Sequence, residues 1–305
     1  RIDKELEGVL SIAKPIPFPK AGVKLKISKA KSQKPKKNNV GVPKLVETIV
    51  DQLIASPINA KKDLFTKHGI EVYEKLMKYG NAKLLNKDNL KSYDFDGKKY
   101  IRGLEYLFSF SGNKKFVETV VLELNESNKV DNISFGLSEV ATKSIDEKPW
   151  ENDVKKIIIH FLENYKTAYA LKRLDYIESI FADDAIIITG YLVEVDPVPE
   201  VYADNKIVKY NRYDKKQYLK KLEYSFSSKE YINLKFEESK VLRSGINSNQ
   251  FGIQIKQNYF SANYGDQGYL FLFVEFNDQN IPLIHVRTWQ PEKSPDGFIY
   301  GLGDF

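Results

Sequence analysis

The chain is 305 residues long, 42% of its residues are hydrophobic, and none is cysteine. A chain of this length normally forms two domains, and its apolar share is enough for buried cores. The missing cysteines exclude disulfides, thiolate metal sites and cysteine nucleophiles, and no apolar run approaches the roughly 18 residues of a membrane-spanning helix. The formal net charge is +6, but residues 1–150 hold 28 Lys and Arg against 19 Asp and Glu, whereas residues 151–305 hold 19 against 22. The basic character therefore belongs to one segment and not to the whole fold.

The N-terminal region 1–43 carries most of the positive excess. Ten lysines and no acidic residue occur between Lys14 and Lys44, together with five prolines. Proline fixes φ and removes a hydrogen-bond donor, so this region is predicted to be extended or irregular. Within it, Val23–Ile27 alternates apolar and charged residues, as in a strand with one wet face. The lysine-rich segment 14–44 suits nucleic acid, an anionic membrane surface or anionic glycans. Because Phe18 is its only aromatic residue and it lacks arginine, a solvated tether is favoured over nucleic-acid binding.

Residues 44–140 are predicted to form an α+β domain that begins with two helices. Apolar residues recur at helical spacing from Val46 onward, and Pro57 would end that helix. A second helical pattern begins near Ala60 and is interrupted by Gly69. These two helices precede an apolar, strand-like region.

The strand-like region is predicted to be an antiparallel meander. Its three strand candidates are Tyr100–Phe110, Phe116–Asn125 and Val130–Ser138. The polar run 126–129 between the last two has the composition of a hairpin turn. Residues 141–151 are predicted to be a linker.

Residues 152–305 are predicted to form the second domain, which opens with the clearest helical pattern in the chain. Apolar residues from Val154 to Tyr169, Phe161 among them, lie on one face of a helix. A shorter helix follows at Leu174–Phe181, and Ala185–Thr189 reads as a short apolar strand.

The rest of the second domain is predicted to contain a long loop, a third helix and a meander. Residues 190–213 read as an insertion with two prolines and four tyrosines. Asp214 followed three residues later by Gln217 has the spacing of a capping box, and Phe226 lies on the apolar face of the helix that it opens. Four strand candidates follow: Tyr231–Arg243, Phe251–Phe260, Tyr269–Phe276 and Leu283–Trp289.

The two domains echo each other in sequence. Glu123–Asn128 and Glu275–Asn280 align as a strand end that enters an Asn-rich turn. Both domains also place helices first and a meander afterwards. Turns reuse Asn and Asp, so one match can arise by chance, but the shared order of elements favours duplication.

Residues 152–291 resemble the nuclear transport factor 2-like superfamily, which includes ketosteroid isomerases and polyketide cyclases. The segment that carries the resemblance is Val154–Gly190, where a long helix leads into a short helix and a strand; the expected helix and sheet of Asp214–Pro291 complete it. The resemblance implies an α+β, cystatin-like fold of two domains. The second would be a cone of three helices packed on a strongly bent antiparallel sheet, and the first a divergent copy. The chain is also similar to two-domain proteins of unknown function from the bacterial cell envelope.

A cone of this kind is packed at one end and open at the other, and such a mouth is a common place for a small-molecule pocket. Enzymes of this superfamily commonly place an Asp or His base and a Tyr donor there. No local motif of this chain assigns these roles to numbered positions, and the fold itself hosts many unrelated functions. The resemblance therefore implies a pocket without implying a reaction.

His285, Arg287 and Trp289 alternate along the last predicted strand, so all three are expected on one side of the sheet. In one interpretation they form a polar wall of the cone, where Arg287 binds an anion, His285 moves a proton and Trp289 stacks on a ligand. In the other interpretation, Ile284 and Val286 are buried and the three residues face solvent or a protein partner. This one is favoured because the aliphatic face of a strand is usually the buried face.

Two tyrosines complete the predicted ligand-binding set. Tyr191 belongs to the insertion 190–213, whose tyrosines either anchor a long loop or form a lid near the cone mouth. Tyr259 follows the alternating polar residues Gln254 to Asn258 on another strand. The candidate ligand-binding residues are therefore Tyr191, Tyr259, His285, Arg287 and Trp289.

No cofactor or metal site is predicted. The three histidines are widely separated, and there is neither a phosphate-binding glycine loop nor a nucleophile-elbow motif. Asp183 and Asp184, which follow the second helix, suit a helix end better than a cavity.

The leading functional interpretation is a non-enzymatic binding or assembly module of the bacterial cell envelope, holding a small molecule or a protein through the cone mouth or the exposed sheet. The alternative is a small-molecule isomerase, dehydratase or hydrolase that uses acid–base residues of the second cone. Binding of an anionic polymer by the lysine-rich segment is a third interpretation. The first residue is Arg1 and not Met, which fits a removed leader and a secreted or periplasmic location. Catalytic residues and oligomeric state stay open.

Overall fold

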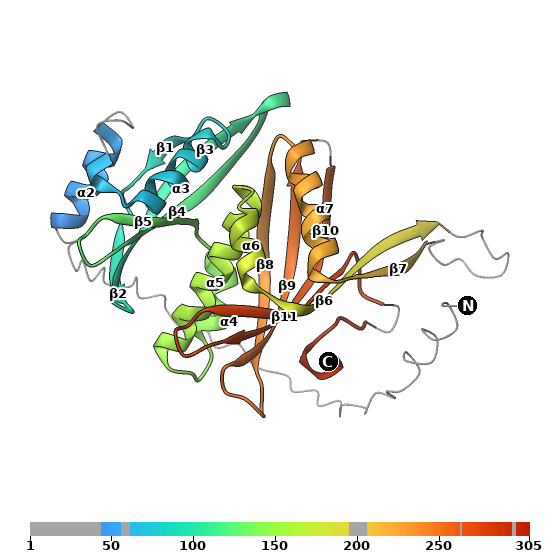
Figure 1. Ribbon diagram of the computed structural model, residues 1–305. Helices are drawn as coiled ribbons and strands as arrows, with labels where there is room; N and C mark the ends of the chain where they lie inside the picture. The colour runs from blue at the N-terminus through green and yellow to red at the C-terminus, as the bar shows by residue number, and fades with distance from the viewer. Residues whose placement is uncertain (1–43, 56–61, 195–205, 263, 295–296) are drawn as a thin grey trace, which may run out of the picture. The chain divides into compact units, whose positions relative to one another are not determined.

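The computed structural model describes residues 44–305 except 56–61, 195–205, 263 and 295–296 (Figure 1). These residues belong to one compact unit, Val42–Phe305. The predictions made for residues 1–43, among them the strand at Val23–Ile27, lie outside the described residues. The described part of the unit holds two separate sheets, one of five and one of six strands, with helices packed against both.

The five-stranded sheet belongs to the N-terminal half of the described chain. It is preceded by helices α2 (Lys44–Ala55) and α3 (Lys67–Lys78). Its strands are β1 (Lys83–Asn86), β2 (Lys91–Phe95), β3 (Lys98–Phe110), β4 (Lys114–Leu124) and β5 (Val130–Phe135), with a short 3₁₀ turn at Ser111–Asn113. The order is β1-β3-β4-β5 with β2 also paired to β3, and every pair is antiparallel. The predicted meander is confirmed, and β1 and β2 are additional strands.

Gly69 lies inside α3 and does not interrupt it. The helix begins at Lys67, not near Ala60, because Thr66 caps it: the Thr66 hydroxyl accepts a hydrogen bond from the Gly69 amide at 3.0 Å. A Cβ atom at Gly69 would lie 1.9 Å from the carbonyl oxygen of Val130. The glycine therefore allows α3 to pack directly on the main chain of β5.

Gly69→Ala is expected to destabilise the protein by about 1–3 kcal/mol. In an exposed helix the same change would stabilise by roughly 0.5–1 kcal/mol, so the sign of the effect reports the close packing. Gly245→Ala is the matched control, because nothing lies within 4 Å of the Cβ position there. Urea unfolding measures both variants, and an unchanged or raised stability of Gly69→Ala would contradict the role of this contact.

The segment predicted as a linker contains a helix, α4 (Glu139–Asp146). Ser138 caps it by accepting a hydrogen bond from the Ala141 amide at 3.2 Å. Ala141 and Ile145 are buried in the core of the C-terminal half. The linker prediction for 141–151 missed this helix because only two of its eight residues are buried, too few for a visible apolar periodicity. The predicted domain boundaries stay predictions.

The C-terminal half consists of three helices and a six-stranded sheet. The helices are α5 (Asn152–Ala170), α6 (Leu174–Ile180) and α7 (Lys215–Ser228). The strands are β6 (Phe181–Glu194), β7 (Lys206–Tyr213), β8 (Ile232–Arg243), β9 (Gln250–Ser261), β10 (Tyr264–Phe276) and β11 (Pro282–Gln290), followed by a 3₁₀ turn at Leu302–Asp304.

The six strands lie in the order β7-β6-β11-β10-β9-β8, with the helices against the sheet (Figure 1). All pairs are antiparallel except β6 with β11, which is parallel and departs from the predicted all-antiparallel sheet. Phe161 and Phe226 belong to one core that the three helices and the sheet share. The predicted α+β arrangement of three helices packed on one sheet is confirmed. No helix among the described residues is long and apolar enough to cross a membrane.

The insertion predicted as a loop is largely a β-hairpin. Residues 187–194 of β6 pair with β7, whereas β11 pairs with β6 only as far as Thr189. Gly190–Glu194 therefore continues past β11 as part of a two-stranded arm (Figure 1). Tyr202 and both prolines of the insertion lie outside the described residues.

The two Asn-rich turns that suggested duplication have the same geometry. In the first, the Asn125 side chain accepts hydrogen bonds from the amides of Ser127 and Lys129, both at 3.0 Å. In the second, the Asn277 side chain accepts from the amides two and four residues later, both at 2.9 Å. Any chain with Asn at this turn position can form such bonds, so the duplication of the first domain stays a prediction.

Candidate functional site

A cavity of 220 Å³ lies in the C-terminal half between α5, α7 and the helix-facing side of the sheet. We call it the tyrosine pocket. Its aromatic and apolar lining is Tyr165, Tyr169, Tyr218, Leu222, Phe226, Ile232, Leu234, Tyr259, Tyr264 and Trp289. Its remaining lining is Thr189, Ser225, Lys229, Gln257, Asp266 and Arg287.

Two helices supply the tyrosines that reach deepest. Tyr165 and Tyr169 are four residues apart on α5, so they stand on the same face one turn apart. Tyr218 comes from the first turns of α7, whose start is held by the predicted capping box: the Gln217 amide donates to the Asp214 carboxylate at 2.7 Å, and the Asp214 amide donates to the Gln217 side chain at 3.2 Å. The box therefore places Tyr218 opposite the α5 pair.

A β-bulge at His285 decides which residues of β11 face the pocket. Phe273 pairs with Val286, but the next residue of β10 pairs with Ile284, so His285 has no partner in the ladder. An extra residue of this kind reverses the alternation of side chains along the strand. Ile284 and Trp289 consequently belong to the same core, and Arg287 lies on their side.

His285 lies on the other side of the sheet. Its ring centroid is 5.8 Å from that of Phe273, and its Nε2 is 3.5 Å from the Glu275 carboxylate. The expectation that His285, Arg287 and Trp289 share one side was therefore wrong for His285, because strict alternation ignores the bulge. The competing expectation, that Ile284 and Val286 together face the core, fails for the same reason.

A chain of hydrogen bonds links Arg287 to the three deep tyrosines. Arg287 Nε donates to the Tyr165 hydroxyl at 3.1 Å, and the Tyr165 hydroxyl donates to the Tyr169 hydroxyl at 3.1 Å. The hydroxyls of Tyr169 and Tyr218 are 2.5 Å apart. The three hydroxyl protons serve only two bonds between tyrosines, so one proton remains for donation into the pocket. Burial raises the pKa of Tyr169 and Tyr218, which keeps both protonated.

Arg287 carries a positive charge that no described carboxylate pairs with directly; Asp266, in the same pocket, acts on it only at longer range. The residue is 9% exposed, and it forms no ion pair with any carboxylate in the part of the chain that the structure describes. Its guanidinium carbon lies 5.2 Å from the centroid of the Tyr218 ring, a favourable cation–π distance. Only Nε donates a hydrogen bond to the described residues, so the two terminal nitrogens are available at the cavity. Burying a charge without a partner is costly.

Further titratable groups of the pocket are Tyr259 on β9, Asp266 on β10 and Lys229 after α7. Burial raises the pKa of Asp266, although the Tyr264 hydroxyl donates to its Oδ2 at 2.7 Å. The other carboxylate oxygen, Oδ1, is buried and accepts no hydrogen bond from the described residues. Tyr259 has its pKa raised to about 12 by burial. Lys229 contributes a second positive charge, with its Nζ 5.8 Å from the Tyr264 ring centroid.

Three of the five predicted ligand-binding residues line the pocket: Tyr259, Arg287 and Trp289. Tyr191 is 43% exposed on the β6–β7 arm and does not line it. Among the described residues, no group of three or more His, Asp or Glu is placed to hold a metal ion. The ligand-binding role of the five residues stays a prediction.

The prediction omitted Tyr165, Tyr169, Tyr218 and Asp266. The three tyrosines were assigned to apolar helix faces, where a tyrosine normally anchors the core. One sequence signal could have found them. Tyrosines recur on helix faces that are predicted to pack inside the same cone, and an arginine lies on a predicted core strand. Asp266 had no signal, because it stands in a polar stretch just before the predicted strand Tyr269–Phe276.

No protein-family model and no curated protein matches this chain. Solved structures with which it can be aligned include a naphthalene 1,2-dioxygenase with indole bound in the active site (6% identity, 48% of this chain and 82% of the other, TM-score 0.37). Others are nuclear transport factor 2 from Cryptosporidium parvum (7%, 46% and 95%, 0.33) and a putative scytalone dehydratase from Novosphingobium aromaticivorans (11%, 48% and 89%, 0.32). At these TM-scores the likeness carries no argument about activity, and the site is interpreted from its own geometry.

Proposed function

We propose that this protein is a binding module whose tyrosine pocket holds a small planar molecule with an anionic oxygen, such as a carboxylate, against Arg287. The observation that carries the proposal is the buried guanidinium without a carboxylate partner, directed at a cavity. A bound anion would supply the missing counter-charge, and the remaining tyrosine proton would supply a second donor to the same group.

The size and lining of the pocket favour a ligand with one ring. A cavity of about 150 Å³ is filled by benzene, so 220 Å³ leaves room for a ring and a carboxylate. Seven of the sixteen lining residues are aromatic, among them Tyr218, Phe226 and Trp289, and these offer flat faces to a ring.

The test compares planar aromatic carboxylates with their neutral twins: benzoate with benzamide, and cinnamate with cinnamyl alcohol. The carboxylates are expected to bind at least tenfold more tightly, because a hydrogen bond to a charged group contributes roughly 1.5–3 kcal/mol. Arg287→Leu should abolish the preference, whereas the control Arg243→Leu, on the partly exposed end of β8, should keep it. Calorimetric titration measures both, and an equal affinity for acid and amide in the unchanged protein would contradict the proposal.

The same variant has a second readout in the ligand-free protein. If Arg287 serves a ligand, Arg287→Leu should leave the free energy of unfolding unchanged or raise it, because it removes an unpaired buried charge. A loss of several kcal/mol would instead indicate a purely structural arginine.

An acid–base enzyme is the second candidate, and Asp266 is the observation that favours it. A buried carboxylate with a raised pKa and one unbonded oxygen has the features of a general base. With phenylpyruvate as probe, Asp266 would take a proton from C3 while Arg287 holds the carboxylate. Deuterium exchange at C3, followed by NMR, should be faster with the protein than without it and should lose that acceleration in Asp266→Asn. A location in the bacterial cell envelope stays a prediction, which fractionation of cells that make the native protein would test.

A further inference from the structure

The first half of β4 has one open edge. Strand β5 pairs with β4 only from Val120 to Leu124, and one further bond, from the Gly136 amide to the Thr119 carbonyl at 2.7 Å, extends this contact. On its other side β4 pairs with β3 along its whole length from Lys114. Within the described ranges, the stretch from Lys114 to Thr119 therefore has a strand neighbour on one side only.

The direction of the free main-chain groups follows from the Thr119 bond. In an antiparallel strand the N–H and C=O groups of one residue point to the same side, and this side alternates from residue to residue. Because Thr119 points to the open side, Val117 presents its amide and carbonyl there as well, whereas Phe116 and Glu118 point to β3. The edge thus offers a donor and an acceptor at Val117.

A second strand edge faces this one. Strand β8 is the last strand of the six-stranded sheet and pairs only with β9. Its outward side is marked by two carbonyls: that of Ile232 accepts from the Tyr79 hydroxyl at 2.8 Å, and that of Phe236 accepts from the Ser138 hydroxyl at 3.3 Å. The strands β4 and β8 are joined here through side chains, as the Asn233 amide donates to the Glu118 carboxylate at 2.7 Å.

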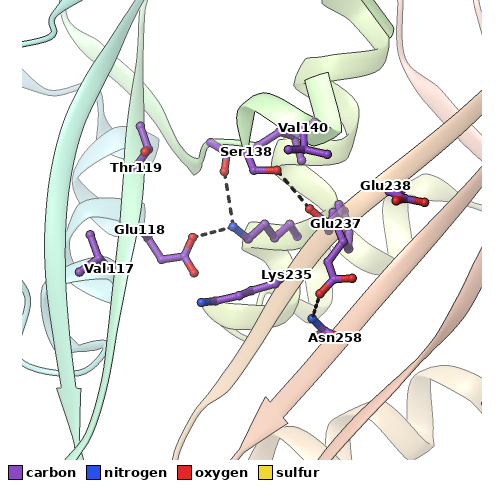
Figure 2. Close-up of a pocket in the computed structure, with 13 residues that line it drawn as sticks. Val117, Glu118, Thr119, Ser138, Val140, Lys235, Glu237, Glu238 and Asn258 are labelled. Carbon is purple, nitrogen blue, oxygen red and sulfur yellow. Dashed lines mark hydrogen bonds and ion pairs between the residues drawn. The ribbon is translucent and has the colours of Figure 1, made fainter. Parts of the chain in front are cut away.

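A cavity of 430 Å³ lies between the two edges (Figure 2), and we call it the edge groove. Its lining is Val117–Thr119 of β4, Gly136–Ser138, Val140 and Lys166, and Lys235–Glu238 with Asn258 from the other sheet. Val117 and Val140 are 51% and 62% exposed, so two apolar side chains stand on its rim beside the exposed Lys235 and Glu238. Natural sheet edges are normally blunted by charge; Lys114 and Lys115 do this at the start of the edge, whereas Val117 does not.

Two charged side chains of the groove, Lys235 and Glu238, form no ion pair with the described residues. Glu118 pairs with Lys166 at 2.6 Å, and Glu237 pairs with Lys256 at 2.9 Å and accepts from Asn258. Lys235 forms no ion pair with the described carboxylates. Its side chain reaches from β8 toward β4 (Figure 2), and its Nζ is 5.8 Å from the Phe116 ring centroid. The groove therefore favours an occupant with a negative charge near Lys235.

We infer that the edge groove binds an extended peptide segment of a partner protein, which adds a strand to β4 at Val117 and places an acidic side chain against Lys235. Main-chain hydrogen bonds supply the affinity in this mode of recognition, and alternate side chains supply the specificity. The site is separate from the tyrosine pocket, with which it shares no lining residue.

The probe is an acetylated and amidated hexapeptide that alternates valine and threonine and carries one central glutamate. Two twins accompany it, one with lysine in place of glutamate and one with alternate amides N-methylated. The glutamate peptide is expected to bind, and at saturation the exchange of the Val117 amide with solvent, followed by NMR, should slow at least tenfold. The methylated twin should not bind, because it cannot form the ladder.

Two variants of the full chain separate main-chain pairing from charge. Val117→Pro removes the amide on the open side and should abolish binding. Lys235→Glu should reverse the preference, weakening the glutamate peptide and strengthening the lysine peptide at least threefold each, while the control Lys240→Glu, farther along β8, should change neither. The Lys235→Glu substitution keeps the test decisive even if the Val117→Pro variant fails to fold.

Three outcomes would overturn the inference: binding of the methylated twin as tight as that of its parent, no slowing of Val117 exchange by any peptide, or peptide preference that ignores Lys235→Glu. A Val117 amide whose protection rises with protein concentration in the absence of peptide would assign the edge to a second copy of this chain instead.

Discussion

Lys166→Met is expected to lower the free energy of unfolding by about 3–5 kcal/mol, the usual effect of breaking a buried ion pair. Lys166 on α5 and Glu118 on β4 are 2.6 Å apart, and their side chains are only 6% and 5% exposed. Glu118 also accepts a hydrogen bond from Asn233 of β8, so one carboxylate joins a helix and both sheets. Without Lys166, the negative charge of Glu118 would be buried with only the Asn233 side-chain amide as a donor.

The rescue of this variant separates charge from packing. Adding Glu118→Gln to Lys166→Met removes the uncompensated charge and should recover at least half of the lost stability. Lys143→Met is the control, because Lys143 pairs with Glu147 on the surface, where both side chains are more than 60% exposed, and such pairs contribute less than about 1 kcal/mol. Chemical unfolding followed by tryptophan fluorescence measures all three, and equal losses for Lys166→Met and Lys143→Met would contradict the assignment.

His160 is expected to make the protein sensitive to acid. The ring lies between the five-stranded sheet and α5, with its Nε2 2.7 Å from the Tyr93 hydroxyl and its centroid 4.0 Å from that of Tyr100. Burial, together with the nearby charges of Arg102, Lys156 and Lys98, lowers the pKa of His160 to about 3. The folded state therefore holds a neutral imidazole that the unfolded chain protonates below its usual pKa of about 6.5.

The direction of the effect follows from proton linkage. Since the unfolded state binds the extra proton, stability is complete above about pH 6.5 and falls as the pH drops from there toward 3. At pH 4 the expected loss from this group is on the order of 2–3 kcal/mol. His160→Gln keeps an acceptor for Tyr93 but does not titrate, so the difference in stability between pH 7.5 and 4 should shrink by that amount.

Tyr93→Phe is the companion variant for this measurement. It removes the hydroxyl and leaves His160 buried, so most of the pH dependence should remain, because burial is the main cause of the lowered pKa. Urea midpoints at several pH values measure both variants. A pH dependence that His160→Gln leaves unchanged would place the acid sensitivity elsewhere.

The long helix α5 shows how much of the fold local pattern predicts. Its apolar face from Val154 to Tyr169 appears in the structure as the centre of the C-terminal core, and the capping box at Asp214 and Gln217 starts α7 as expected. Strands of the meander also follow their predicted ranges, except that β10 begins at Tyr264 and not at Tyr269. In these elements the signal is periodic and several residues long, and burial of the periodic face is what stabilises them.

Helix α4 and the site residues on β11 show where local pattern is insufficient. The helix has only two buried residues, and its position is decided by contacts with β8, such as the hydrogen bond from Ser239 to the Ala141 carbonyl. On β11, a single unpaired residue changes which side chains face the pocket. A bulge depends on the neighbouring strand, so alternation within one strand cannot reveal it.

The order of the long helices and strands, their apolar faces and the capping box of α7 were determined by the sequence alone, because each depends on residues close together in the chain. The candidate site was decided by tertiary structure. Arg287 bonds to Tyr165, which is 122 positions away in the chain, and the fold brings no described carboxylate into an ion pair with it. The open edge of β4 likewise depends on the fold. Strand β5 pairs only with the second half of β4, and β8 belongs to the other sheet and does not pair with β4. Charge compensation and strand pairing depend on residues that are distant in the sequence and become neighbours only when the chain folds.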